Sequence, residues 1–305
     1  MTILKKAIPK DFAAPTALPA SAEQTGRWQR ANRTWWNSNP MRYDWTEPLG
    51  VREGSPAFYD EIDRRFFSEL EQFMPWRIKP FDPLVDFDAL GRWDMLEIGV
   101  GNGSHAGLFA RNARSFTGID LTDYAVKSTS GRMRCFGIDA TILQMDAEVM
   151  AFRDNSFDFI WSWGVIHHSA DTERVLGEMR RVLKPGGTAI TMVYHRTLWN
   201  YYMMGGLIYR LAPGHPLRKK SVHEIVQLTT DGAIARFYSI PEWRALTSKF
   251  FTVEDVRICG GKAEVIPLPN GSFKRAVMRA VPDGLARLAT NRLKQGTFLV
   301  STLRK

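Results

Sequence analysis

Three glycines, Gly99, Gly101 and Gly103, alternate directly after a short apolar run that ends at Ile98. Glycine lets the backbone turn sharply and approach a ligand closely. Ligands of open α/β sheets bind at the carboxyl ends of the strands. Asp120 follows Gly101 by 19 residues, at the end of the next predicted strand, where a carboxylate can accept hydrogen bonds from ribose hydroxyls. The pattern indicates a nucleotide-containing cofactor; the alternative is a tight structural turn.

The spacing of the glycines separates two classes of cofactor. A dinucleotide fingerprint reads G-x-G-x-x-G, with the N-terminus of the next helix facing a pyrophosphate. This chain instead has G-x-G-x-G, with Glu97 two residues before the first glycine. An acid at that point suits an ammonium group better than a pyrophosphate. S-adenosylmethionine carries an ammonium and a sulfonium, so the loop favours it over a nicotinamide cofactor.

Apolar strands and amphipathic helices alternate around this loop. The order predicts a doubly wound, Rossmann-like α/β fold with a parallel sheet. The predicted strands are 93–98, 115–119, 141–145, 157–163, 188–194, 252–258 and 295–303. The predicted helices are 55–73, 104–113, 122–135, 171–183 and 241–250.

Composition divides the chain into five segments. Residues 1–26, rich in Ala and Pro, predict a flexible tail, and residues 27–90 predict an aromatic-rich, helical N-terminal cap. The cofactor-binding core takes residues 91–195, and an insertion or lid takes residues 196–240. Residues 241–305 complete the sheet and contain a second, basic insertion, 261–294.

Five motifs in sequence order resemble the methyltransferase-domain family with the class I fold, of the broad "type 11" kind. The resemblance covers about a third of the chain and implies a methyltransferase that uses S-adenosylmethionine. It is specific for fold and cofactor and leaves the substrate open. The motifs are 96–103, Gly118-Ile119-Asp120, 144–148 with the turn 154–157, 157–168, and 181–187.

The resemblance also implies a role for each motif. The glycines would flank the amino-acid portion of the cofactor, and Glu97 would act on its ammonium group. Asp120 would bind the ribose. Asp146 would accept a hydrogen bond from the adenine amino group beside a backbone contact from Ala147; the alternative for Asp146 is a helix cap. Residues 161–164 would line the pocket near the methionine portion. The expected cofactor-binding residues are Glu97, Gly99, Gly101, Gly103, Asp120, Leu121, Asp146, Ala147, Trp161, Trp163 and Gly164.

Histidines follow two of the predicted strands. His167 and His168 come just after strand 157–163, and His195 comes just after strand 188–194. Both places lie on the ligand-binding edge of the sheet, so we expect these residues to contact the substrate or to act as bases. The alternative is a hydrogen bond that holds a loop. The residues expected to bind the substrate are Tyr43, Trp45, Tyr194 and Tyr201.

The net charge of +9 is unevenly distributed. Residues 1–195 hold 23 basic and 25 acidic side chains, whereas residues 196–305 hold 18 basic and 7 acidic ones. Within the basic part, residues 198–212 are almost wholly apolar or aromatic and precede Arg218-Lys219-Lys220. We expect a lid whose apolar face is internal, because Gly205-Gly206 interrupts the helix. The alternative is an interfacial helix at a membrane surface.

The predicted function is methylation of a small-molecule acceptor, an anionic or lipid-like one, by in-line displacement at an oxygen. One alternative is an acceptor at a membrane surface, a nucleic acid or a protein. Another is a non-catalytic, methyltransferase-like partner subunit. We expect no nucleic-acid partner, because the sequence contains no Asn/Asp-Pro-Pro-aromatic motif and no RNA-binding module. The oligomeric state is left open.

Two cysteines, Cys135 and Cys259, are too few for a disulfide scaffold or a cysteine-built metal site. The six histidines show no metal-ligand spacing, so no metal is expected. The sequence has no signal-peptide pattern at its start and no apolar run of about 18 residues. The expected location is therefore the cytoplasm, with peripheral membrane contact left open.

Overall fold

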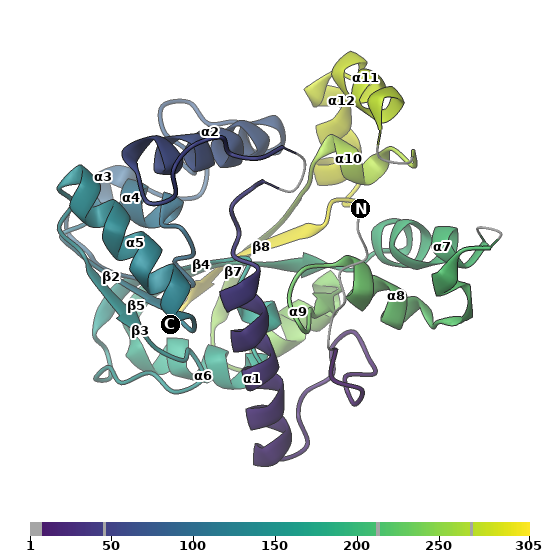
Figure 1. Ribbon diagram of the computed structural model, residues 1–305. Coiled ribbons are helices and arrows are strands. Elements are labelled where there is room, and N and C mark those ends of the chain that lie inside the picture. The colour runs from purple at the N-terminus through teal and green to yellow at the C-terminus, as the bar shows by residue number, and fades with distance from the viewer. Residues whose placement is uncertain (1–7, 45–46, 212–213, 269–270) are drawn as a thin grey trace.

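The computed structural model describes residues 8–44, 47–211, 214–268 and 271–305, and its centre is one eight-stranded sheet (Figure 1). The strand order is β3-β2-β1-β4-β5-β8-β7, and β6 pairs with β5. All pairs are parallel except those of β8 with β5 and β7. The strands are β1 (Asp94–Ile98), β2 (Ser115–Asp120), β3 (Thr141–Gln144), β4 (Phe157–Trp163), β5 (Leu183–His195), β6 (Phe237–Tyr238), β7 (Thr252–Cys259) and β8 (Phe298–Arg304).

Helices cover both faces of the sheet. Figure 1 shows α2 to α5 above the sheet and α6 and α9 below it. The longer helices are α1 (Ala22–Ser38), α2 (Pro56–Phe73), α4 (Ser104–Ala110), α5 (Asp123–Phe136), α6 (Thr172–Val182), α8 (Val222–Thr229), α9 (Ile240–Thr247) and α11 (Ser272–Ala280). The shorter ones are α3 (Phe87–Leu90), α7 (Ile208–Leu211), α10 (Lys262–Val265), α12 (Asp283–Arg287), the 3-10 turns η1 (Ile166–His168) and η3 (Pro216–Lys219), and the π-helical η2 (Leu198–Leu207) and η4 (Leu288–Arg292).

The two faces of the sheet carry separate hydrophobic cores. Leu176 of α6 and Trp243 of α9 belong to the core below the sheet. Phe66 of α2 and Phe109 of α4 belong to the core above it. The chain reverses its winding direction between β1 and β4, and this reversal places helices on both faces of the sheet. Ligands of such folds bind at this reversal.

The predicted doubly wound fold is confirmed, and so are two predicted helix starts. Ser55 accepts a hydrogen bond from the backbone N–H of Phe58, and Pro56 occupies the first turn of α2. Asp171 caps α6 by accepting from Arg174. These starts depend on residues three positions apart, so local sequence is enough to predict them.

The N-terminal segment differs from the expected flexible tail. Residues 8–21 pack on the fold, and α1 already begins at Ala22. Phe12 is buried against Trp28, with ring centroids 5.3 Å apart. The indole N–H of Trp28 donates to Asp11 at 2.9 Å, and the buried Arg236 donates to the carbonyl of Ala17 at 2.7 Å. The partners of this segment lie far away in sequence, so its composition could not reveal them.

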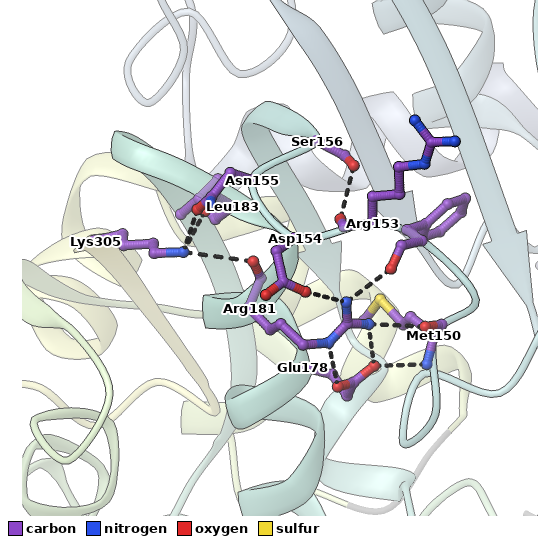
Figure 2. Close-up of polar contacts among 10 residues, drawn as sticks. Met150, Arg153, Asp154, Asn155, Ser156, Glu178, Arg181, Leu183 and Lys305 are labelled. Atoms are coloured by element: carbon purple, nitrogen blue, oxygen red, sulfur yellow. Dashed lines mark hydrogen bonds and ion pairs between the residues drawn. The ribbon is translucent and has the colours of Figure 1, made fainter.

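A hydrogen-bond cluster around Arg181 holds the chain between β3 and β4 (Figure 2). The guanidinium donates to the carbonyls of Met150 at 2.8 Å and Phe152 at 2.7 Å. It also pairs with Glu178 through two hydrogen bonds, of 2.8 and 2.7 Å, and with Asp154 through one of 2.8 Å. These carboxylates raise the pKa of Arg181, so the cation is firmly held. The segment after β3 is thereby fixed to the end of α6.

We predict that Arg181→Met lowers the free energy of unfolding by about 2–4 kcal/mol, because two backbone carbonyls and two carboxylates lose their charged donor. Urea denaturation followed by circular dichroism would measure the change. Arg153→Met is the matched control, since its exposed side chain makes no hydrogen bond among the described residues. A control that loses as much stability as Arg181→Met would contradict this role.

No helix within the described ranges is long and apolar enough to cross a bilayer.

Candidate active site

The glycine loop after β1 leaves open space beside one glycine only. All three glycines have positive φ, at 84° for Gly99, 53° for Gly101 and 80° for Gly103. A Cβ on Gly99 would lie 2.2 Å from the side chain of Val165, so the loop after β4 can approach only a glycine there. A Cβ on Gly101 would meet no atom within 4 Å. Gly101 therefore faces the cavity.

Asp120 joins this loop to the next helix. One carboxylate oxygen accepts from the backbone N–H of Thr122 at 2.9 Å and from its hydroxyl at 2.8 Å. The other accepts from the N–H of Gly101 at 3.2 Å. Burial raises the pKa of Asp120, while these hydrogen bonds act in the opposite direction. The carboxylate is thus held in place at the wall of the cavity.

Asp146 meets the N-terminal helix across the open edge of the sheet. Its Oδ1 accepts from the side-chain amide of Gln29 at 2.8 Å and from the N–H of Glu148 at 2.9 Å. The side-chain carbonyl oxygen of Gln29 in turn accepts from the backbone N–H of Ala170 at 3.1 Å. The amide of Asn32 donates to the carbonyl of His168. Helix α1 therefore covers the cavity, a role that the sequence analysis missed.

A local signal for the start of α1 is present in the sequence. Ser21 and Gln24 have the S-x-x-Q spacing of a helix N-terminus. In the structure the hydroxyl of Ser21 accepts from the N–H of Gln24 at 3.2 Å. This spacing predicts the helix, but it does not predict which surface the helix covers.

Glu97 lies beneath the glycine loop rather than at the cavity wall. Its carboxylate is fully buried, and neither oxygen has a hydrogen-bond partner. Burial raises its pKa, against the effect of His105, whose Nδ1 lies 3.3 Å from Oε1. His105 does line the cavity. A buried acid with unfilled hydrogen-bonding capacity is suited to a positively charged ligand, reached here next to His105.

The cavity has a volume of about 370 Å³ and brings together most of the expected cofactor residues. Gly103 does not line it, because it starts α4 against Thr129 and Arg132. Trp161 does not line it either, since its fully buried ring stacks under Trp163 at 5.3 Å. The expected residues that do line the cavity are Gly99, Gly101, Asp120, Leu121, Asp146, Ala147, Trp163 and Gly164.

The rest of the cavity lining is mainly aromatic and apolar. Tyr43 and Tyr194, both expected to bind the substrate, are part of this lining. Trp45 lies outside the described residues. Tyr201 lies elsewhere, because its hydroxyl is 2.8 Å from Nδ1 of His223 and its ring packs on Phe237. Other apolar or aromatic side chains of this lining are Trp36, Met41, Ile62, Phe66, Leu70, Phe73, Met192 and Phe298.

The three expected histidines have different surroundings, and only His168 lines the cavity. Its Nδ1 lies 2.8 Å from the carbonyl of Ile234, so Nδ1 carries the proton. A Cβ on Gly232 would lie 2.4 Å from this nitrogen, so only glycine, here with φ of 78°, lets the loop come so close. With the proton on Nδ1, the neutral form of the ring carries its lone pair on Nε2.

His167 and His195 do not reach the cavity. His167 is fully buried without a hydrogen bond to either ring nitrogen, and burial holds its pKa well below the usual value. His195 has its Nδ1 2.9 Å from the carbonyl of Gly296. It therefore fits the alternative of a loop-holding hydrogen bond.

The predicted lid over residues 198–212 is wrong for the described part of that segment. None of residues 198–211 lines the cavity. The close contact of Gly206 with Val222 instead packs η2 against α8. Leu198 and Leu211 are 75% and 68% exposed. The insertion contributes only Asp231 to the cavity wall, and α1 with α2 provides the cover.

The part of the chain that carries this geometry matches a known protein family. Residues 96–191 match the family model described as "Methyltransferase domain". These residues are a class I methyltransferase domain. The match begins at β1 and ends within β5, and it contains the glycine loop, Asp120, Asp146 and the loop of His168.

Two relatives of the methyltransferase domain match this chain over about a third of their own length. The phthiotriol/phenolphthiotriol dimycocerosates methyltransferase of Mycobacterium tuberculosis is 36% identical over 100 residues, 32% of this chain and 36% of that protein. The 27-O-demethylrifamycin SV methyltransferase of Amycolatopsis mediterranei is 33% identical over 96 residues, 30% of this chain and 35% of that protein. The segments outside the domain are not part of these matches.

A solved structure extends the similarity in fold to most of the chain. The cyclase SpnF has a TM-score of 0.52 and 16% sequence identity, and the match covers 91% of this chain and 95% of that one. Such a likeness shows the fold alone, because one fold serves many reactions.

Similarity to this family implies the use of S-adenosylmethionine, and three observations fit that cofactor. Open space lies beside Gly101. Asp120 presents a carboxylate at the cavity wall, and Glu97 is a buried acid without a hydrogen bond. These groups suit, respectively, a closely approaching ligand, the hydroxyls of a ribose and an ammonium group.

We predict that Asp120→Ala weakens the binding of S-adenosylhomocysteine at least about tenfold, since hydrogen bonds to a charged acceptor each stabilise by about 1.5–3 kcal/mol. Isothermal titration calorimetry would measure it. Asp123→Ala is the matched control, because Asp123 lies three residues away and pairs with Lys127 on the surface. Unchanged affinity in a folded Asp120→Ala variant would contradict the ribose assignment.

Proposed function

We propose that this protein is an S-adenosylmethionine-dependent methyltransferase that methylates an oxygen of a small, largely apolar acceptor. The observation that carries the proposal is one shared cavity. Its wall includes the glycine loop, Asp120 and Asp146, and also His168 with a set of aromatic and apolar side chains, which we call the aromatic chamber. Two reactants held in one cavity react without the entropic cost of a chance encounter.

The methyltransferase domain would hold the cofactor through the glycine loop, Glu97, Asp120 and Asp146. The cofactor supplies an electrophilic methyl group on its sulfonium. The residues of this chain bind and orient the two reactants. Helix α1 and the rings of Trp36 and Trp163 cover the cavity and exclude water from it.

The charges at the cavity wall favour an acceptor that is uncharged or cationic. No lysine or arginine is among the described residues that line the cavity. Glu69 of α2 and Asp231 line it, and burial raises the pKa of Glu69. Burial raises the pKa of Tyr43, and the charges of both acids add to this effect. The wall offers an anionic acceptor no lysine or arginine among the described residues, so we propose an apolar, non-anionic one.

The name of one relative agrees with an oxygen as the methylated atom, because that protein is named for 27-O-demethylrifamycin SV. The other relative is named for dimycocerosates.

The acceptor class can be tested with a panel of hydroxylated aromatic and aliphatic compounds and S-adenosylmethionine carrying a radiolabelled methyl group. We predict label transfer to neutral members, and at least about tenfold lower kcat/KM for the carboxylated analogue of each. Glu69→Gln should recover part of that loss. No calorimetric binding of S-adenosylmethionine or S-adenosylhomocysteine would contradict the enzymatic function itself. Preference for the carboxylated members would contradict only the acceptor class.

His168 is positioned to take the proton of the acceptor hydroxyl. Its Nδ1–H is engaged with the carbonyl of Ile234, which leaves Nε2 as the basic nitrogen. The rings of Trp36 and Tyr194 pack beside it, with centroids 5.0 and 5.6 Å away. When the acceptor oxygen took the methyl group and the bond between that methyl group and the sulfur of the cofactor broke, Nε2 would accept the hydroxyl proton.

We predict that His168→Gln lowers kcat about 100-fold or more toward a neutral hydroxyl acceptor and leaves the Kd of S-adenosylhomocysteine unchanged. The loss should shrink as the pH approaches the pKa of the acceptor, because ionisation then replaces the base. His195→Gln is the control and should keep its kcat, since His195 does not line the cavity. An equal loss at all pH values would indicate that His168 only shapes the site.

A further inference from the structure

Exposed apolar side chains are concentrated in the two insertions. Of the twelve large hydrophobic residues recorded as exposed in the described part of the chain, eight lie within residues 198–293. Phe273, Leu285 and Leu293 are 70%, 59% and 63% exposed. On the surface of a soluble protein such residues usually lie singly, so their concentration in two adjoining segments needs an explanation. The eight are Leu198, Tyr202, Ile208, Leu211, Phe273, Leu285, Leu288 and Leu293.

The same insertions carry the chain's excess of basic over acidic side chains. Residues 196–240 hold six basic and two acidic side chains, and residues 261–294 hold seven basic and two acidic ones. Arg275 and Arg279 on α11 are exposed and form no ion pair among the described residues. Exposed cations therefore lie beside exposed apolar groups on the same elements.

Helix α11 shows this arrangement at single-residue resolution. Lys274 is buried and its ammonium donates to the carbonyl of Ala263 at 3.0 Å, so this side of the helix faces the protein. Phe273 and Ala276 form an exposed apolar line, and Arg275 and Arg279 lie beside it one turn apart. Such a helix suits the boundary between water and lipid headgroups.

The two insertions adjoin each other. The indole N–H of Trp199 in η2 donates to the carbonyl of Glu264 in α10 at 3.1 Å. In Figure 1, α7 and α8 lie at the same end of the sheet, on the right, as α10, α11 and α12. We name residues 198–211 together with residues 272–294 the docking face.

The docking face is attached by hydrogen bonds to the end of α2, which lines the cavity. Arg287 donates to the carbonyl of Gln72 at 2.8 Å, and Asn291 donates to the carbonyl of Phe73 at 2.9 Å. The ring of Phe73 lies 5.4 Å from that of Phe298, and both line the cavity. A surface that engages the docking face thus lies next to the aromatic chamber.

We propose that the docking face binds reversibly to the surface of a membrane rich in anionic lipids. The exposed leucines and Phe273 enter the acyl boundary, and the arginines and lysines pair with lipid phosphates. The positive charge of the docking face selects an anionic partner. The exposed leucines select a lipid surface over an acidic protein surface, because a purely acidic surface would leave them without an apolar partner. Membrane binding is independent of catalysis and holds whichever atom is methylated.

Vesicle sedimentation of the full chain tests the proposal. The probes are vesicles of phosphatidylcholine alone and vesicles with about 30% phosphatidylglycerol. We expect at least about tenfold stronger partitioning onto the anionic vesicles, falling steeply between about 0.1 and 0.5 M salt. Absence of binding to anionic vesicles at low salt would overturn the proposal.

Two sets of variants separate the apolar and the charged contributions. Phe273→Ser with Leu285→Ser and Leu293→Ser should lower partitioning at least about fivefold. The matched control is Ile78→Ser with Val149→Ser, because these residues are 85% and 59% exposed outside the docking face. Arg275→Glu with Arg279→Glu should abolish the preference for anionic vesicles, whereas Arg153→Glu should keep it. An equal effect of controls and test variants would overturn the proposal, as would binding to mixed oligonucleotides that exceeds vesicle binding and ignores the serine variants.

Discussion

The carboxylate of Asp120 is the interaction on which the rest of the site depends. It accepts from the backbone of Gly101 and Thr122 and so joins the loop after β1 to the start of α5. Helix α5 completes the connection, because the hydroxyl of Thr129 donates to the carbonyl of Gly101 at 2.9 Å and Arg132 donates to that of Asn102 at 2.8 Å. A loop with three positive φ angles is thereby held from two sides before any ligand binds, which lowers the cost of ordering it.

Closure of the site uses chain from the far N-terminus. Gln29 connects Asp146 with Ala170, and Asn32 reaches the carbonyl of His168. Asn32 is itself buried, and buried polar groups need partners, so α1 and the loop after β4 stabilise each other's positions. Arg236, which lies in the insertion, also donates a hydrogen bond to the carbonyl of Ala17. The aromatic chamber is therefore assembled from segments that are otherwise separate in the sequence.

The positive charge of the chain has a meaning different from the one that composition first suggests. The methyltransferase domain lies in the slightly acidic part, and acids alone supply the formal charges at the described cavity wall. The excess of lysine and arginine lies in the insertions that form the docking face. The positive excess therefore bears on where the protein binds rather than on how it handles an acceptor.

The sequence by itself determined the elements between β1 and β5, the helix starts at Ser55 and Asp171, and the family. These depend on residues a few positions apart, whose spacing sets the backbone conformation directly. Tertiary structure decided which of two neighbouring histidines, His167 or His168, reaches the cavity, since a short turn directs them to different surroundings. It also decided that α1 covers the site and that residues 198–211 do not. The cover by α1 depends on partners more than 100 positions away, and no local pattern encodes it.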